Sequence, residues 1–160
     1  MRVYNLGKSE IEKLVQQIDS QLKVKYEKKL KDVRVVEIDE MARVLVHGSF
    51  KVVQFGDSVV PFLGDATAVA SMPSVVVDPG AIKFVCNGAD VMRPGIVKIE
   101  GDFDKGARVV VKESTHGKAI AVGEALFTSI ELKNAQKGAV VKNMHYVGDK
   151  VWEGFKEANV

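Results

Sequence analysis

The chain has 160 residues and a net charge of +2, from 23 lysines and arginines against 21 aspartates and glutamates. An apolar fraction of 46% and a charged fraction of 28% are ordinary for a globular protein, which argues against disorder, a collagen-like fibre or a disulfide scaffold. No apolar run reaches the roughly 18 residues that a membrane span needs, and no leader-like segment opens the chain, so we expect a cytoplasmic protein.

The first predicted element is a helix near the N-terminus. Ser9 and Glu12 have the spacing of a capping box, and apolar residues then recur at helical period as far as Leu22. Strand patterns follow at residues 33–38, 42–46 and 50–55. We therefore expect a small α+β domain with an antiparallel sheet.

A run of cations lies between the helix and the strands. It consists of Lys23, Lys25, Lys28, Lys29, Lys31 and Arg34, offset only by Glu27 and Asp32. Two interpretations stay open: a solvated helix end and loop, or a basic patch for RNA or an acidic partner. Because the net charge is small, nucleic-acid binding would require such a local patch.

Glycine content rises near residue 73, with four glycines before it and ten after it. The charge does not shift there and the joint is short, so we expect two packed domains, residues 1–72 and 73–160. In the second domain a strand at 74–77 precedes a short helix, for which Asp78 suits the N-cap and Pro79 the first position. The helix should end at Asn87-Gly88. Its buried side is expected to be Ala81, Ile82, Phe84 and Val85.

The rest of the chain is predicted to form short strands joined by tight turns. They are expected at 96–99, 108–112, 118–122 and 139–146, with a strand end or single helical turn at 127–132. Short, closely spaced strands with many glycines are typical of a small barrel, here with one helix across it.

Enzymatic signals are weak. The sequence holds no phosphate loop, dinucleotide fingerprint, nucleophile elbow or H-E-x-x-H pair. Cys86 is expected to be a small core residue and, as the single cysteine, permits no disulfide and no zinc cluster. His145 is either a satisfied structural histidine or a surface contact. The remaining candidates are expected to be solvated turn residues: His47, His116, and the pair Asp102 and Asp104. We expect no enzyme activity, metal or cofactor.

Two segments carry residue types that suit RNA. Residues 77–95 offer a helix N-terminus for a phosphate, a Gly-Ala pair that backbone or ligand can approach closely, and two cations. Residues 142–146 alternate polar and apolar side chains on the last strand. A groove between them would read nucleic-acid shape through backbone, Asn and Lys contacts. The alternative is that the glycines only serve tight barrel turns.

The segment 77–95 closely resembles the opening motif of the PUA domain, the RNA-binding domain of pseudouridine synthases and archaeosine transglycosylases. That motif runs Asp-x-Gly-Ala, a short helix, Gly-Ala, then Met or Leu and Pro-Gly. Residues 119–123 look like the central strand of that domain, and residues 137–141 and 145–149 look like its closing strand. The resemblance covers about residues 73–153.

The whole chain is similar, more narrowly, to the family of the malignant T-cell-amplified sequence protein, in an archaeal-type form. The phrases at 80–85 and 143–146, followed by Asp149 and Trp152, carry this resemblance. It implies an α+β N-terminal pre-PUA domain followed by a mainly β PUA pseudo-barrel. It also implies a non-catalytic RNA-binding role in translation. The partners would be tRNA or rRNA, the small ribosomal subunit in initiation or recycling, and a density-regulated-protein-like protein.

By carry-over, the resemblance implies an RNA-binding groove. One wall would be Gly80, Lys83, Gly88, Ala89, Asp90, Met92 and Arg93, and the other Lys142, Asn143 and His145. Two other functions stay open: an accessory RNA-targeting subunit for a tRNA- or rRNA-modifying enzyme, and a protein-interaction module on the apolar strands near Phe50, Phe55 and Phe62. Trp152 is expected to cover one end of the barrel or the joint between the domains.

Overall fold

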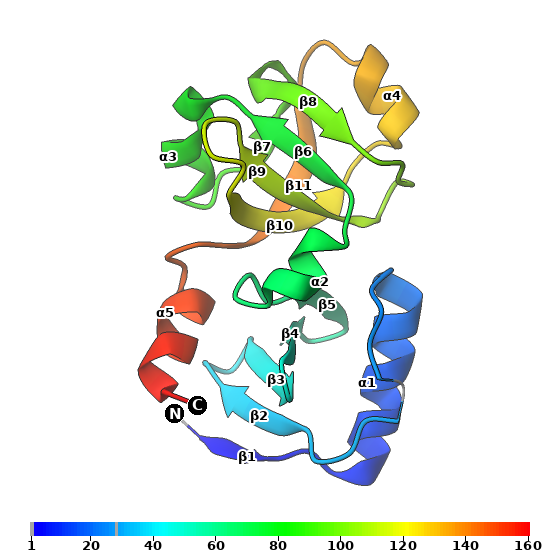
Figure 1. Ribbon diagram of the computed structural model, residues 1–160, viewed down its shortest axis with the longest axis vertical. Coiled ribbons are helices and arrows are strands. Elements are labelled where there is room, and N and C mark those ends of the chain that lie inside the picture. Colours follow the sequence, from blue (N-terminus) through cyan, green and yellow to red (C-terminus); the bar gives the residue numbers. More distant parts are fainter. Residues whose placement is uncertain (1, 28) are drawn as a thin grey trace. The chain divides into compact units, whose positions relative to one another are not determined.

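The computed structural model describes residues 2–27 and 29–160 and divides into two compact units (Figure 1). Unit 1 contains the chain up to Ala70 together with Lys150–Val160, and unit 2 is Ser71–Asp149. The last residues therefore differ from the expectation that everything after residue 72 forms one domain. Within the described residues, no helix is long and apolar enough to cross a membrane.

Unit 1 is built on a five-stranded antiparallel sheet in the order β1-β2-β3-β4-β5. The strands are β1 Val3–Asn5, β2 Arg34–Glu37, β3 Arg43–His47, β4 Phe50–Phe55 and β5 Ser58–Pro61, and the helices are α1 Lys8–Gln21, α2 Ala66–Ala70 and α5 Lys150–Ala158. Strands β1 and β5 and helices α2 and α5 were not expected from the sequence. Helix α1 begins after Gly7, which makes no side-chain cap bond, so the capping box expected at Ser9 does not form.

Helix α1 packs on one face of this sheet. Its Leu14 and Ile18 are buried and join a core with Val35, Leu45 and Val52 of the central strands. The helical period of α1 and the two-residue period of the strands thus bring their apolar sides together, as the sequence predicted.

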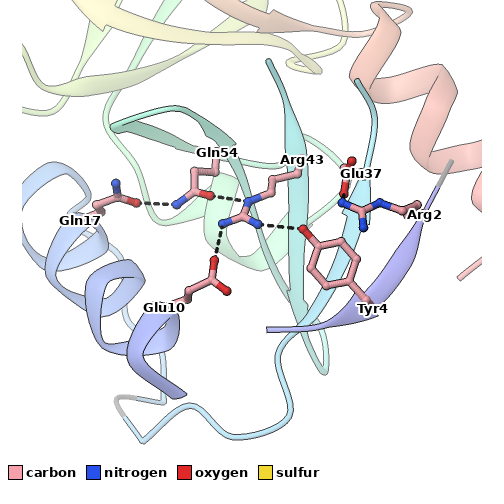
Figure 2. A network of polar contacts seen from close by, with 7 residues as sticks. All are labelled: Arg2, Tyr4, Glu10, Gln17, Glu37, Arg43 and Gln54. Atoms are coloured by element: carbon pink, nitrogen blue, oxygen red, sulfur yellow. Dashed lines mark hydrogen bonds and ion pairs between the residues drawn. The ribbon is translucent and has the colours of Figure 1, made fainter. Parts of the chain in front are cut away.

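A polar network closes one end of this helix–sheet contact (Figure 2). Arg43 donates its Nε–H to Gln54 Oε1 at 2.7 Å and an Nη1–H to the Tyr4 hydroxyl at 3.0 Å. It also approaches Glu10 Oε2 at 3.5 Å, and Gln54 donates to Gln17 Oε1 at 2.7 Å. Because Glu10 and Gln17 lie on α1, these bonds tie the helix to the strands, and we assign the network a structural role.

Helix α5 belongs to unit 1 because its aromatic residues pack on Phe62. The Phe62 ring lies 5.9 Å from the Trp152 ring and 4.7 Å from the Phe155 ring, measured between centroids. Lys150 also forms an ion pair with Asp39 of the β2–β3 turn. Trp152 was expected on the barrel end or at the joint between domains. Its ring instead stacks within unit 1, which corrects the assignment of residues 150–160 to the second domain.

Unit 2 is a curled six-stranded sheet in the order β7-β11-β10-β9-β6-β8. The strands are β6 Ser74–Val77, β7 Val91–Met92, β8 Ile96–Glu100, β9 Arg108–Glu113, β10 Ala119–Ala125 and β11 Ala139–Tyr146. The helical segments are η1 Pro79–Ala81, α3 Ile82–Val85, η2 Arg93–Gly95 and α4 Ser129–Asn134. Strands β6 and β9 pair in parallel, and the other pairs are antiparallel. This arrangement confirms the expected fold class, an α+β unit and a mainly β half-barrel.

Two details of unit 2 show how local sequence sets its geometry. Thr128 and Glu131 form a capping box that starts α4, so the expected single helical turn is present. Strand β10 carries an irregularity at Val122-Gly123, where β11 approaches closely. A side chain at Gly123 would collide with the Lys142 carbonyl oxygen, so this position requires glycine.

Candidate nucleic-acid interface

The residues that the sequence singled out lie at the start of η1, which leads directly into α3, and in the turn that follows α3. The Asp78 carboxylate accepts a hydrogen bond from the Gly80 N–H at 2.7 Å, and Pro79 occupies the first helical position. Gly88 adopts φ +94°, the left-handed conformation that ends a helix. The expected caps are thereby confirmed. Helix α3 is a single turn, and the turn that follows it, Asn87–Asp90, is exposed to solvent.

A pocket of about 420 Å³ opens beside α3 and β7. Four predicted site residues line it: Gly80, Ala89, Asp90 and Met92. The rest of its wall is Asp78, Ala81, Phe84, Val85, Val91 and Gly95. Most of this lining is apolar, and polar groups stand at its margin. Such a surface suits a flat apolar ligand face with polar edges, for example an unpaired base.

Phe84 is the main surprise at this site. It was expected on the buried side of α3, but its side chain is 58% exposed, and the nearby Met92 is 52% exposed. Within a single helical turn, Val85 reaches the core while the preceding positions, Lys83 and Phe84, face solvent. The Lys83 ammonium lies 5.1 Å from the centroid of the Phe84 ring. An exposed aromatic ring beside a cation is a platform on which a base can stack.

Asn143 of β11 holds the turn that follows α3 in place. Its amide Nδ2 donates to the carbonyl oxygens of Val85 and Ala89, both at 3.0 Å, and its backbone N–H donates to Asp90 Oδ1 at 3.0 Å. Its Oδ1 is buried and has no hydrogen-bond partner among the described residues. Both amide protons are therefore used to hold the turn after α3 against β11. Asn143 acts as a positioning residue, where the sequence suggested an RNA contact.

Arg93 is also engaged internally. Its Nε–H donates to the Leu132 carbonyl at 2.8 Å, near the end of α4, and Nη1 donates to the Ile96 carbonyl at 3.3 Å. The side chain is half-buried. Part of its donor capacity remains at the surface, but its first role is to join α4 to η2.

His145 cannot belong to the surface. Its side chain is fully buried, and Nδ1 lies 2.8 Å from Asp149 Oδ2, which also accepts the Tyr146 N–H at 2.9 Å. The expectation that His145 contacts RNA is corrected, and the alternative of a satisfied structural histidine holds. On β11, His145 lies opposite Val122 of β10, which is also fully buried.

The other predicted residues remain accessible. Lys83, Gly88 and Lys142 are exposed. Lys142 follows Val141, which pairs with Val91 of the pocket wall. Lys83, beside Phe84, is a cation at this surface, and Lys142 is an exposed cation on the neighbouring strand.

Cys86 is half-buried, not a full core residue. Burial raises the pKa of its thiol, which is opposite to what activates a cysteine nucleophile. Among the described residues no group of three His, Cys, Asp or Glu side chains could hold a metal ion.

Known proteins are similar to this chain in sequence and in fold. Residues 73–147 match the PUA domain family. An uncharacterized protein of Methanocaldococcus jannaschii is 39% identical over 93% of this chain and 94% of its own length. A solved structure of a hypothetical protein from Pyrococcus horikoshii has a TM-score of 0.76 at 28% identity, covering 95% of this chain and 98% of that one.

Two eukaryotic relatives match about half of the chain. Translation machinery-associated protein 20 of Saccharomyces cerevisiae is 37% identical over 50% of this chain and 48% of its own length. Malignant T-cell-amplified sequence 1-B of Xenopus laevis is 34% identical over 51% of this chain and 46% of its own length. The chain belongs to the family of PUA-domain proteins that includes the Methanocaldococcus jannaschii relative, and it is homologous to the malignant T-cell-amplified sequence and translation machinery-associated 20 proteins.

Proposed function

We propose that this protein is a non-catalytic RNA-binding protein that acts in translation, on tRNA and the small ribosomal subunit in initiation or recycling. The observation that carries the proposal is the pocket beside α3, with Phe84 and Met92 exposed at its mouth, inside the segment that matches the PUA domain. The names of two homologous proteins, which refer to the translation machinery, support the choice of process.

The chemistry of the pocket favours an unpaired nucleotide over a duplex. An aromatic ring and a thioether at its mouth can contact a base face, and Lys83 and Lys142 can each meet a phosphate. Asp90 Oδ1 already accepts the Asn143 N–H, so its second oxygen is the acceptor left for a base amino group. We therefore expect the RNA to place one base against the pocket while its phosphates bind the two lysines.

Cytoplasmic location and a density-regulated-protein-like partner remain part of this proposal. The absence of a recognisable catalytic motif supports the non-catalytic role, and the raised pKa of Cys86 argues against the one thiol as a nucleophile.

The test is a binding titration of the purified chain against initiator tRNA, bulk tRNA and small ribosomal subunits, at salt concentrations from about 50 to 200 mM. Phe84→Ala should weaken binding by about 1–3 kcal/mol, the usual worth of one stacked base. The matched control is Ile130→Ala, because Ile130 of α4 is 69% exposed and does not line the pocket.

Two results would change the conclusion. If the chain shows no salt-dependent binding to initiator tRNA, bulk tRNA or small ribosomal subunits at low ionic strength, RNA binding is refuted. Binding to bulk tRNA without any preference for small subunits would favour an accessory role in RNA modification over a role in translation.

A further inference from the structure

We propose that the basic loop of unit 1, residues 22–34, is a second RNA contact that binds phosphates without reading sequence. The choice of RNA as ligand rests on the proposed function of unit 2. The loop itself lies in unit 1, outside the segment that matches the PUA domain. Figure 1 shows it as the blue connection between α1 and β2.

Charge is concentrated in this loop. It holds six cationic and two acidic residues, a net +4, in a chain whose total is +2, so the remaining residues together carry −2. A polyanion that meets the protein therefore finds one strongly positive segment on a weakly negative background. Such a local excess attracts nucleic acid even when the net charge is small.

Apart from Arg34, which begins β2, the described residues of the loop form no helix or strand, but apolar side chains fasten the loop to unit 1. Leu22, Leu30 and Val33 are buried in the core beneath the sheet. The Tyr26 ring stacks on Phe50 at 5.1 Å between centroids, with an interplanar angle of 11°. These contacts recur along the loop, so its backbone is held at several points.

Polar contacts hold the loop further. The Tyr26 hydroxyl donates to Asp19 Oδ1 at 2.7 Å, and His47 Nδ1 lies 2.7 Å from the Lys31 carbonyl oxygen. Since a carbonyl can only accept, His47 donates through Nδ1. Burial and the bond to Asp19 raise the pKa of Tyr26, which keeps that hydroxyl protonated as a donor.

Four lysines of the loop are exposed to solvent. Lys23, Lys25, Lys29 and Lys31 are exposed, and among the described residues none of their ammonium groups is paired with a carboxylate. Ammonium groups on an anchored backbone lose less freedom on binding than those of a disordered tail. The arrangement therefore offers a preorganised set of charges that has no internal partner.

The composition of the loop selects the ligand class. Its large apolar residues are used in the core, so no exposed hydrophobic side chain remains to insert into a membrane surface. Lysine is a point charge that meets phosphates without the forked geometry that reads a base edge. A phosphate backbone recognised irrespective of sequence is the ligand that fits.

The experiment compares two variants that lose the same charge. The loop variant carries Lys→Gln at positions 23, 25, 29 and 31, and the control carries Lys→Gln at positions 8, 13, 118 and 156, which are also exposed. Binding to tRNA and to an unrelated RNA duplex is measured across a salt series. Each lost phosphate contact should lower the slope of log K against log salt by about 0.7–0.9, so the loop variant should lose about 3 in slope on both RNAs.

Equal slopes for the loop variant and the control would overturn the inference. So would an unchanged RNA slope in a loop variant that has lost binding to polyglutamate, because the loop would then serve an acidic protein. Phe84→Ala is measured beside them. If Phe84→Ala has no effect on RNA binding while the loop variant loses slope, the loop contact is supported and the groove assignment is refuted. If Phe84→Ala weakens RNA binding while the loop variant keeps its slope, the loop contact alone is refuted.

Discussion

Asn143 gives the sharpest test of how the groove is held. In Asn143→Ala, two hydrogen bonds to the Val85 and Ala89 carbonyls are lost, at about 1 kcal/mol each. The change also removes the buried Oδ1 that has no partner, which returns about 1 kcal/mol or more. We therefore expect a net loss of only about 1 kcal/mol in the free energy of unfolding.

Asn143→Asp should behave very differently although it preserves shape. It removes both donors and places a carboxylate oxygen against two carbonyl oxygens, so we expect a loss of about 3 kcal/mol or more. Those neighbours disfavour the charged form and raise the pKa of the introduced carboxyl above its unfolded value. The destabilisation should therefore shrink as the pH falls through that raised value, where the protonated acid can donate one bond again.

The assay is urea denaturation at several pH values, with Asn87→Ala as control because Asn87 is exposed in the same turn. Thermal denaturation gives a second measure: for a chain of this size 1 kcal/mol corresponds to about 2–4 °C, so the melting temperatures of the Ala and Asp variants should differ clearly. RNA affinity should fall with stability of the turn. Equal stability of the Ala and Asp variants, with a loss of RNA affinity alone, would refute the positioning role and restore Asn143 as a direct contact.

Three further outcomes test the fold. Gly123→Ala should destabilise the protein by about 3 kcal/mol or more, because its methyl group meets the Lys142 carbonyl, and an unchanged urea midpoint would show that β10 and β11 can separate. Phe62→Ala should cost about 3–5 kcal/mol, since the ring is 4% exposed and carries both aromatic residues of α5; a melting temperature like that of wild type would place α5 elsewhere. The backbone N–H of His116, with other N–H groups of the same turn, holds the pKa of Glu113 below its usual range. The stabilisation that the Glu113 carboxylate contributes is present above about pH 4.3 and is lost as the pH falls through its lowered pKa. Wild type and Glu113→Gln should therefore converge in stability in acid.

Local signals explain what could be predicted of the fold. Asp78 and Pro79 start η1 and Gly88 turns the chain after α3, each through its own backbone chemistry, so the sequence reveals them without knowledge of the fold. The strands of unit 1 were visible for the same reason, because alternation is a property of neighbouring residues. Helix α5 was missed although Asp149 and Asn159 at its two ends are residue types that favour helix termini, because the segment is short and its docking depends on Phe62, far away in the sequence.

The site residues were harder to predict because exposure depends on tertiary structure. Phe84 and Val85 are neighbours of similar hydrophobicity, and only the packing of one helical turn on β10 and β11 decides which of them is buried. His145 and Lys142 lie on the same strand, but the first is buried and the second exposed, and the register irregularity between them breaks the simple alternation of faces. The motif points to the stretch of chain that lines the pocket, but it does not separate the residues exposed beside the pocket from those that hold them in place.

The two proposed contacts have different physical consequences, which makes them separable in one set of titrations. A phosphate contact by the loop contributes the same salt-dependent term to every RNA, so it cancels in the ratio of affinities for two RNAs. A base contact at Phe84 contributes to one RNA and not to another, and it carries little of the salt slope. Because the two sites share no residues, their effects should add. The loop variant should therefore lower the slope and keep the ratio of affinities, and Phe84→Ala should lower the ratio and keep the slope. A variant of either site that moved both quantities together would mean that one surface serves both roles.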